Sequence, residues 1–213
     1  MQLNTKHRMK FFARILLWLL GWKIKDTLPP EIKKCVIIAA PHTSNFDFFI
    51  GRLAYWQTGL KISFLIKKES FNFIMGPMLV ASGGIPVDRS KNTHMVDRVA
   101  EMFNTRDSFY VVITPEGTRQ LTKKWRKGFY YIALKANVPI ALVYVDYKKK
   151  EGGYGPIINP SGDYEKDLKI IQDFYKTIIP KHPENSSLTP TISAPLKIKK
   201  SIQELKGQYC CKR

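Results

Sequence analysis

Residues 35–47 read CVIIAAPHTSNFD, and this stretch decides the architecture of the chain. Its first six residues form an unbroken apolar run, typical of a strand that is buried on both faces. A polar loop follows at once, and residues 46–56 have the spacing of a helix. A buried strand, a loop and a helix in succession indicate an α/β domain with a parallel sheet.

The same alternation continues along the rest of the chain. Further runs typical of strands lie at 62–66, 85–87, 109–114, 139–147 and 155–158. Helical spacing is found at 95–103, 129–136 and 164–179, whereas 71–81 is ambiguous. We therefore predict one α/β domain, residues 27–182, in which helices flank a largely parallel central sheet. Residues 183–213 are basic and contain several prolines, and we expect them to form a loosely packed tail.

The most hydrophobic stretch, FFARILLWLLGW at 11–22, contains an arginine and is shorter than the roughly 20 apolar residues of a spanning helix. No small-residue cleavage site follows it, as a secretory signal requires. Its basic flanks and two tryptophans favour an amphipathic helix, within residues 1–26, that lies in a membrane interface. Packing of this helix on the domain's own core is the alternative.

The charge balance points to a polyanionic partner. The chain has 213 residues with 35 Lys plus Arg against 17 Asp plus Glu, a net charge of +18. A hydrophobic content of 44% excludes a disordered basic tail. The partner classes are nucleic acid, an anionic membrane face, a phosphate-bearing substrate or an acidic carrier protein. Three cysteines exclude a disulfide framework and favour a reducing, cytoplasmic setting, and no metal-ligand spacing is present.

Ligands of parallel sheets bind beyond the carboxyl ends of the strands, so the polar loops at those ends are the candidate site. In the first loop, a carboxylate at Asp47 on one ring nitrogen of His42 would fix the tautomer. The other nitrogen would then be free to accept a proton. Ser44 and Asp47 also have the spacing of a capping box, which would explain Asp47 without catalysis. Both interpretations stay open.

The other two loops contain candidate anion ligands. Arg89 has a guanidinium suited to phosphate, although an ion pair with Asp88 is equally compatible with its position. The loop PEGTR at 115–119 combines a flexible glycine, a hydroxyl and an arginine, as in an anion-binding nest. A simple turn is the competing interpretation.

Four blocks occur in one order: HxxxxD at 42–47, GIPVDR at 84–89, PEGTR at 115–119 and VPI at 138–140. This combination resembles the glycerolipid acyltransferases of the 1-acylglycerol-3-phosphate acyltransferase family, in particular its short bacterial members. The resemblance implies a glycerol-3-phosphate acyltransferase-like fold behind the N-terminal helix. The chain departs from the usual blocks at Pro41, Pro86 and Gln120, so the acceptor does not follow from the blocks.

The resemblance also implies roles for the residues in the blocks. His42 would be the general base and Asp47 its orienting partner. Pro139 would belong to the acyl-chain side. The acceptor's phosphate or polar head would be held by Arg89, Glu116, Gly117, Thr118 and Arg119.

On this basis the expected activity is transfer of a fatty acyl group from acyl-CoA or an acidic acyl-carrier protein to the hydroxyl of a lyso-lipid. The first candidate acceptor is 1-acylglycerol-3-phosphate, and a lyso-aminolipid or another lyso-lipid is the alternative. No cofactor, metal or acyl-enzyme intermediate is expected. The expected location is peripheral, at the cytoplasmic face of the membrane.

Two rival functions come from other classes. Basic runs that include an aromatic residue, KKWRK at 123–127 and YKKK at 147–150, could bind nucleic acid, but they fit an anionic leaflet equally well. No nucleic-acid-binding motif accompanies them, so no nucleic-acid partner is expected. A lipid-binding module that retains the fold without catalysis is the other rival, and the presence of both His42 and Asp47 argues against it.

Overall fold

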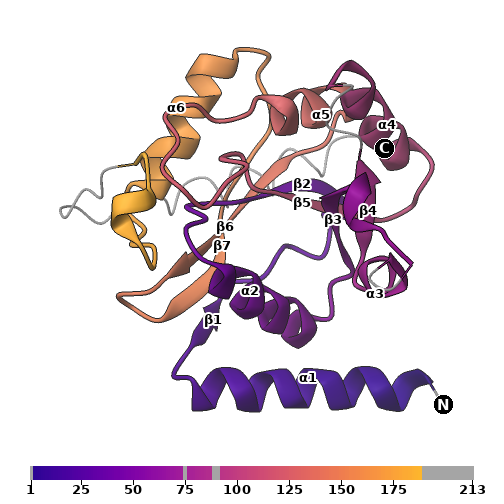
Figure 1. Ribbon diagram of the computed structural model, residues 1–213, viewed down its shortest axis with the longest axis vertical. Coiled ribbons are helices and arrows are strands. Elements are labelled where there is room, and N and C mark those ends of the chain that lie inside the picture. Colours follow the sequence, from indigo (N-terminus) through magenta and orange to yellow (C-terminus); the bar gives the residue numbers. More distant parts are fainter. Residues whose placement is uncertain (1, 74–75, 88–91, 189–213) are drawn as a thin grey trace.

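A mostly parallel sheet crosses the middle of the molecule (Figure 1). The computed structural model describes residues 2–73, 76–87 and 92–188. Within these ranges the strands are β1 (Lys23–Lys25), β2 (Lys34–Ala39), β3 (Ile62–Lys67), β4 (Gly84–Val87), β5 (Phe109–Ile113), β6 (Ile140–Asp146) and β7 (Glu151–Ile158). They form one sheet in the order β1-β7-β6-β2-β5-β3-β4.

Strand direction brings several strand ends to one edge of the sheet. The five strands from β6 to β4 run parallel, with β2 between β5 and β6. β7 runs antiparallel to β6, and β1 pairs parallel with β7. The loops after β2, β5 and β6 therefore emerge at the same edge, and the chain enters β1 there as well.

Helices cover both faces of this sheet (Figure 1). The helices are α1 (Gln2–Leu19), α2 (Asn45–Thr58), α3 (Gly76–Ala81), α4 (Asn92–Asn104), α5 (Gly128–Ala136) and α6 (Tyr164–Tyr175). Short 3-10 turns lie at Lys68–Ser70 and Pro183–Asn185. α4, α5 and α6 cover one face, α2 covers the other, and α1 packs on α2 from outside.

The apolar side chains of β2 divide between two cores. Val36 and Ile38 face the larger core, which α4, α5 and α6 close. Cys35 and Ile37 face the smaller core under α2, where burial raises the pKa of the Cys35 thiol to about 12. Because both faces of β2 are fully buried, this strand anchors the loop that follows it.

The N-terminal helix is buried on one side only. Ala13 and Leu17 pack with Ile50 and Leu53 of α2, so this side belongs to the protein's own core. The opposite side remains in solvent, where Trp18 is 75% exposed. The alternative of packing on the domain's own core is thus observed for one side of the helix, and the membrane contact of the other side stays a prediction.

The predicted α/β fold with a largely parallel sheet is confirmed, and most predicted elements lie within a few residues of their observed bounds. Two edge features were not predicted. β1 lies within the segment 1–26 that was expected to be helical, and β7 begins four residues earlier than the predicted strand. Gly153 permits the pairing of β7 with β1, because a Cβ there would collide with the carbonyl oxygen of Lys25.

The start of the predicted tail contacts the domain. Leu188 is buried in the larger core. His182, the last residue of the predicted domain, donates its backbone N–H to Thr43 Oγ1 at 3.2 Å. The predicted tail beyond residue 188 lies outside the described residues, as do Asp88 and Arg89.

Candidate active site

The loop after β2 places His42 beside Asp47. His42 Nδ1 lies 3.1 Å from Asp47 Oδ2, and both side chains are largely buried. The chain turns at Pro41, which follows a cis peptide bond, and His42 folds back over the first turn of α2. The sequence prediction that these two side chains are partners agrees with this geometry.

Asp47 also caps α2. Ser44 is the N-cap residue, its hydroxyl accepts from the N–H of Phe46, and Asp47 Oδ2 accepts from the N–H of Ser44 at 2.9 Å. The same oxygen accepts from the N–H of Thr43 at 3.0 Å. The capping box and the pairing with His42 therefore occur together, because one carboxylate both caps the helix and contacts the imidazole.

The second carboxylate oxygen of Asp47 is bonded as well. Tyr147, directly after β6, donates its hydroxyl to Asp47 Oδ1 at 2.6 Å. Burial opposes ionisation of Asp47, but the hydrogen bonds from His42, Tyr147 and Ser44 outweigh it and lower the pKa of this carboxyl. An ionised Asp47 accepts hydrogen bonds only, so His42 donates to it from Nδ1, and Nε2 is the ring nitrogen that Asp47 leaves unoccupied.

Glu116 accepts a hydrogen bond from the backbone of His42. It is 6% exposed, and its Oε2 accepts from the N–H of His42 at 2.7 Å. Burial raises the pKa of Glu116, and the hydrogen bond from His42 opposes this rise. A buried carboxylate used in this way fixes the loop after β2, and the substrate contact that the resemblance implies for Glu116 stays a prediction.

The remaining residues of the third block are divided between the pocket and the surface. Gly117, with φ of +67°, lines the pocket, and its N–H donates to Thr114 O. Thr118 and Arg119 are exposed on the next part of the loop, and Thr118 Oγ1 accepts from the N–H of Gln120. The turn interpretation of this loop is therefore realised, and the anion nest stays a prediction.

One other predicted site residue, Pro139, lies away from the pair. Pro139 precedes β6, whose register with β2 puts it at the amino end of these strands, whereas His42 follows the carboxyl end. Pro139 is not among the residues that line the pocket. Arg89 lies outside the described residues.

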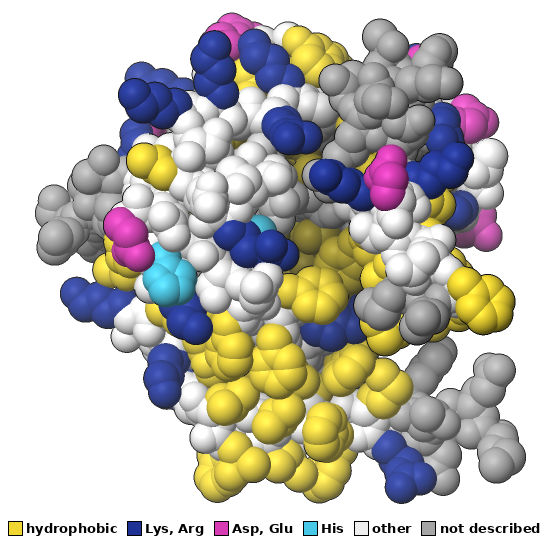
Figure 2. Space-filling model, viewed as in Figure 1, with side chains coloured by type: hydrophobic (Ala, Val, Ile, Leu, Met, Phe, Trp, Pro, Cys, Tyr) yellow, Lys and Arg dark blue, Asp and Glu magenta, His cyan; other side chains and the backbone are white. Residues whose placement is uncertain are grey.

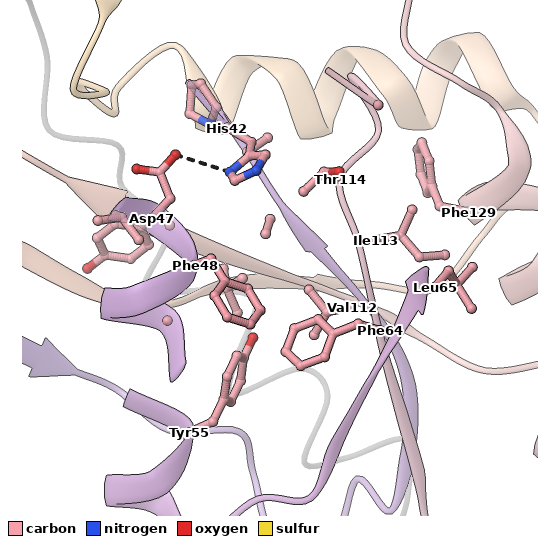
Figure 3. A pocket seen from close by; sticks show the side chains of 18 of the residues that line it. His42, Asp47, Phe48, Tyr55, Phe64, Leu65, Val112, Ile113, Thr114 and Phe129 are labelled. Atoms are coloured by element: carbon pink, nitrogen blue, oxygen red, sulfur yellow. Dashed lines mark hydrogen bonds and ion pairs between the residues drawn. The ribbon is translucent and has the colours of Figure 1, made fainter. Parts of the chain in front are cut away.

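A cavity of about 1020 Å³ opens beside His42 and Asp47 (Figure 3). It reaches both faces of the sheet, because Phe64 and Val112 belong to the core under α2 whereas Leu65 and Ile113 pack on the other core. Figure 3 shows the polar pair at one end of the cavity and these apolar side chains toward the other. Under α2, Gly51 leaves open space where a Cβ would stand.

Basic side chains stand at the cavity, as the hollow in Figure 2 also shows. Those that line it are Arg52, Lys67, Arg126 and Lys127. Arg126 lies directly over Gly117, since a Cβ on this glycine would come within 2.6 Å of Arg126 Nε. A residue outside the predicted blocks thus places a guanidinium at the cavity, beside the loop of the third block.

Sequence reasoning missed Tyr147 and Arg126 as site residues. Tyr147 ends a predicted strand at the binding edge of the sheet, and this position is a signal that could have identified it. Arg126 lies in a basic run that was interpreted only as a surface patch.

For metals, no three His, Cys, Asp or Glu side chains gather within residues 2–73, 76–87 and 92–188.

Comparison with known proteins gives a matching family model and a solved structure with a similar fold. The model described as Acyltransferase matches residues 22–146, more than half of the chain. The crystal structure of the 1-acyl-sn-glycerophosphate (LPA) acyltransferase PlsC from Thermotoga maritima has a similar fold, with a TM-score of 0.55 and 14% sequence identity. This match covers 80% of the present chain and 77% of the PlsC chain. A search of curated proteins gives no match.

The lowered pKa of Asp47 predicts a pH-dependent contribution to stability. The ionised carboxylate stabilises the fold at neutral pH, and this contribution is lost as the pH falls through the folded-state pKa. We expect Asp47→Asn to lower the free energy of unfolding by about 1 kcal/mol at pH 7, the usual size for a lost cap. Urea denaturation at decreasing pH should show this difference shrinking.

Ser44→Ala is the matched control, because it removes the other half of the capping box without removing a carboxylate. Its effect on the free energy of unfolding should stay constant over the same pH range. An Asp47→Asn difference that also stayed constant would contradict the assignment.

Proposed function

Because the chain belongs to the acyltransferase family, we propose that it transfers a fatty acyl group from an acyl thioester to the hydroxyl of a lyso-lipid, with His42 as general base. The observation that carries this proposal is the His42–Asp47 pair at the end of a large apolar cavity with basic side chains along it. Such a cavity suits a substrate with a long apolar chain and an anionic head.

His42 supplies the proton transfer that the reaction needs. Its Nε2 takes the proton from the acceptor hydroxyl while that oxygen attacks the thioester carbonyl. As the new C–O bond forms and the C–S bond breaks, the imidazolium returns the proton to the departing thiolate. Asp47 stabilises the positive charge on the ring between these two steps, and no serine or cysteine nucleophile takes part.

The shape of the cavity supports a lyso-lipid as the acceptor. The reaction brings together two apolar chains, one on the donor and one already on the acceptor. The cavity has apolar lining on both faces of the sheet, with Phe48 and Phe64 on one side and Phe129 and Ile132 on the other. The two parts can therefore hold two chains that meet near His42.

The basic side chains support a phosphate-bearing head, and we place 1-acylglycerol-3-phosphate first among acceptors. Arg126 and Lys127 come from one side of the cavity and Lys67 from the end of β3. A guanidinium and two ammonium groups can bind a phosphate dianion by charge-assisted hydrogen bonds. The acyl donor is acyl-CoA or an acidic acyl-carrier protein, both of which suit a protein of net charge +18.

We further propose that the outer side of α1, with the exposed end of α2, rests on a membrane surface. Phe11, Phe12, Trp18 and Leu19 are exposed on α1, and Phe48 and Phe49 on α2. Figure 2 shows apolar side chains gathered over the lower part of the molecule, where Figure 1 places these helices. None of the described helices is long and apolar enough to span a bilayer. The contact would set the mouth of the cavity, beside Phe48, close to the lipid.

Loss of the general base should abolish most of the activity. With purified protein, acyl-CoA or acyl-carrier protein and a panel of lyso-lipids, we expect His42→Ala to lower the transfer rate about 10²–10⁴-fold. His182→Ala is the control, since this exposed ring pairs only with Glu184 among the described groups. Full activity in His42→Ala, or no transfer by the wild type to any acceptor, would sink the proposal.

Substitution of Arg126 and substitution of Arg119 should have different effects on binding of the acceptor's anionic head. Arg126→Ala should raise KM for 1-acylglycerol-3-phosphate about tenfold, the effect of one lost charge-assisted hydrogen bond, with a smaller change in kcat. Arg119→Ala should have the lesser effect, because its side chain lies outside the cavity lining. Unchanged KM in Arg126→Ala, or transfer only to an uncharged acceptor, would contradict the phosphate assignment.

Membrane attachment is best tested by surface substitution, since removal of residues 1–26 would also remove β1 from the sheet. Trp18→Glu should reduce binding to phosphatidylglycerol vesicles about tenfold or more, because burial of a large apolar side chain is lost. Ile170→Glu on α6 adds the same charge to an exposed apolar position on the opposite side of the sheet. Equal sedimentation of the two variants with the vesicles would argue against attachment through α1.

A further inference from the structure

The hydroxyl of Tyr147 completes the hydrogen bonding of Asp47. Oδ2 of Asp47 accepts from the ring of His42 and from two backbone N–H groups, whereas Oδ1 accepts from Tyr147. Donors on both oxygens fix the rotation of the carboxylate. The direction in which Oδ2 presents its lone pair to His42 is then set by Tyr147 as well as by the helix cap.

Tyr147 is itself held by the segment that follows α1. β1 runs opposite to β6, so Trp22, just before β1, and Tyr147, just after β6, meet at the same edge of the sheet. Their rings stack edge to face with centroids 5.1 Å apart and planes at 88°. Trp22 is buried in the same cluster as Leu17 of α1. Packed contacts thus connect α1 to Asp47 through two aromatic rings.

The phenol remains a hydrogen-bond donor throughout the working pH range. Burial, together with the hydrogen bond to Asp47 and the negative charge of that carboxylate, raises the pKa of Tyr147 well above its ordinary value. The other titratable groups that face Asp47 are His42 and Glu116. Neither of them reaches Oδ1, so the bond from Tyr147 is separate from the contacts that the sequence blocks provide.

We propose that Tyr147 is a positioning residue for the His42–Asp47 pair and that Trp22, seated by α1, holds the Tyr147 ring in place. This inference rests on the proposed acyl transfer at His42. Tyr147 acts through Asp47: it restrains the carboxylate that orients the base and takes no part in proton transfer. Correct packing of α1 on α2 is then a condition for full catalytic rate.

The first test uses the whole chain of 213 residues and needs no substrate. The titration of the Asp47 carboxyl is followed by ¹³C NMR in the wild type, in Tyr147→Phe and in Tyr110→Phe. Removal of a donor to the ionised form should raise the pKa of Asp47, a change of about tenfold in its acid dissociation constant. Tyr110→Phe is the matched control, since it removes a phenol that donates to Ile32 O away from the site.

The second test is kinetic. With palmitoyl-CoA and the acceptor that the wild type uses, Tyr147→Phe should lower kcat about tenfold while KM for the acceptor stays near its original value. Melting temperatures check that both tyrosine variants are folded. An unchanged Asp47 titration, or a shifted titration with unchanged kcat, would overturn the positioning role.

The role of Trp22 is tested by a double-mutant cycle. Trp22→Leu should lower kcat in the same direction as Tyr147→Phe, and it should have little further effect when Tyr147 is already Phe. Additive losses would show that Trp22 acts independently and would overturn that part of the proposal. If the wild type transfers no acyl group, the proposed function fails, while the NMR titration still decides whether Tyr147 sets the state of Asp47.

Discussion

The site depends on one buried carboxylate. Asp47 accepts hydrogen bonds from the His42 ring, two backbone N–H groups and the Tyr147 hydroxyl. These donors outweigh the cost of burial, so the charge remains and can stabilise an imidazolium. Because the same carboxylate caps α2, the His42 ring is held against a rigid element, which restricts its orientation.

The surroundings of this carboxylate follow from the sheet. β2 is buried on both faces and lies between two parallel neighbours, so the loop that contains His42 leaves from the centre of the edge where ligands bind. Glu116, after β5, fixes the backbone of this loop, and Tyr147, after β6, fixes its carboxylate. Three neighbouring strands thus each supply one part of a constellation whose apolar cavity continues onto both faces of the sheet.

Elements with a strong local pattern could be predicted, and those defined by distant partners could not. The apolar run of β2 and the helical spacing of α4 contain their own signal. β1 is three residues, KIK, and the first half of β7 is rich in glycine, so neither has the apolar alternation of a strand. They exist because each pairs with the other across more than a hundred residues of chain. For α1, the sequence offered a membrane face or a core face; the structure shows one side packed in the core and the other side apolar and exposed.

The sequence by itself determined the α/β class and the loops after two strands that hold His42 and Glu116, and it offered the pairing of His42 with Asp47 as one of two interpretations. These depend on residues close together in the chain, where spacing constrains geometry directly. Only the tertiary structure decided that Asp47 is both cap and partner, that Glu116 holds backbone, and that Arg126 stands at the cavity where Arg119 does not. It also decided that Tyr147, a hundred residues away from Asp47, donates a hydrogen bond to the second oxygen of that carboxylate. Contacts over such distances are set by strand order and direction, which no local pattern specifies.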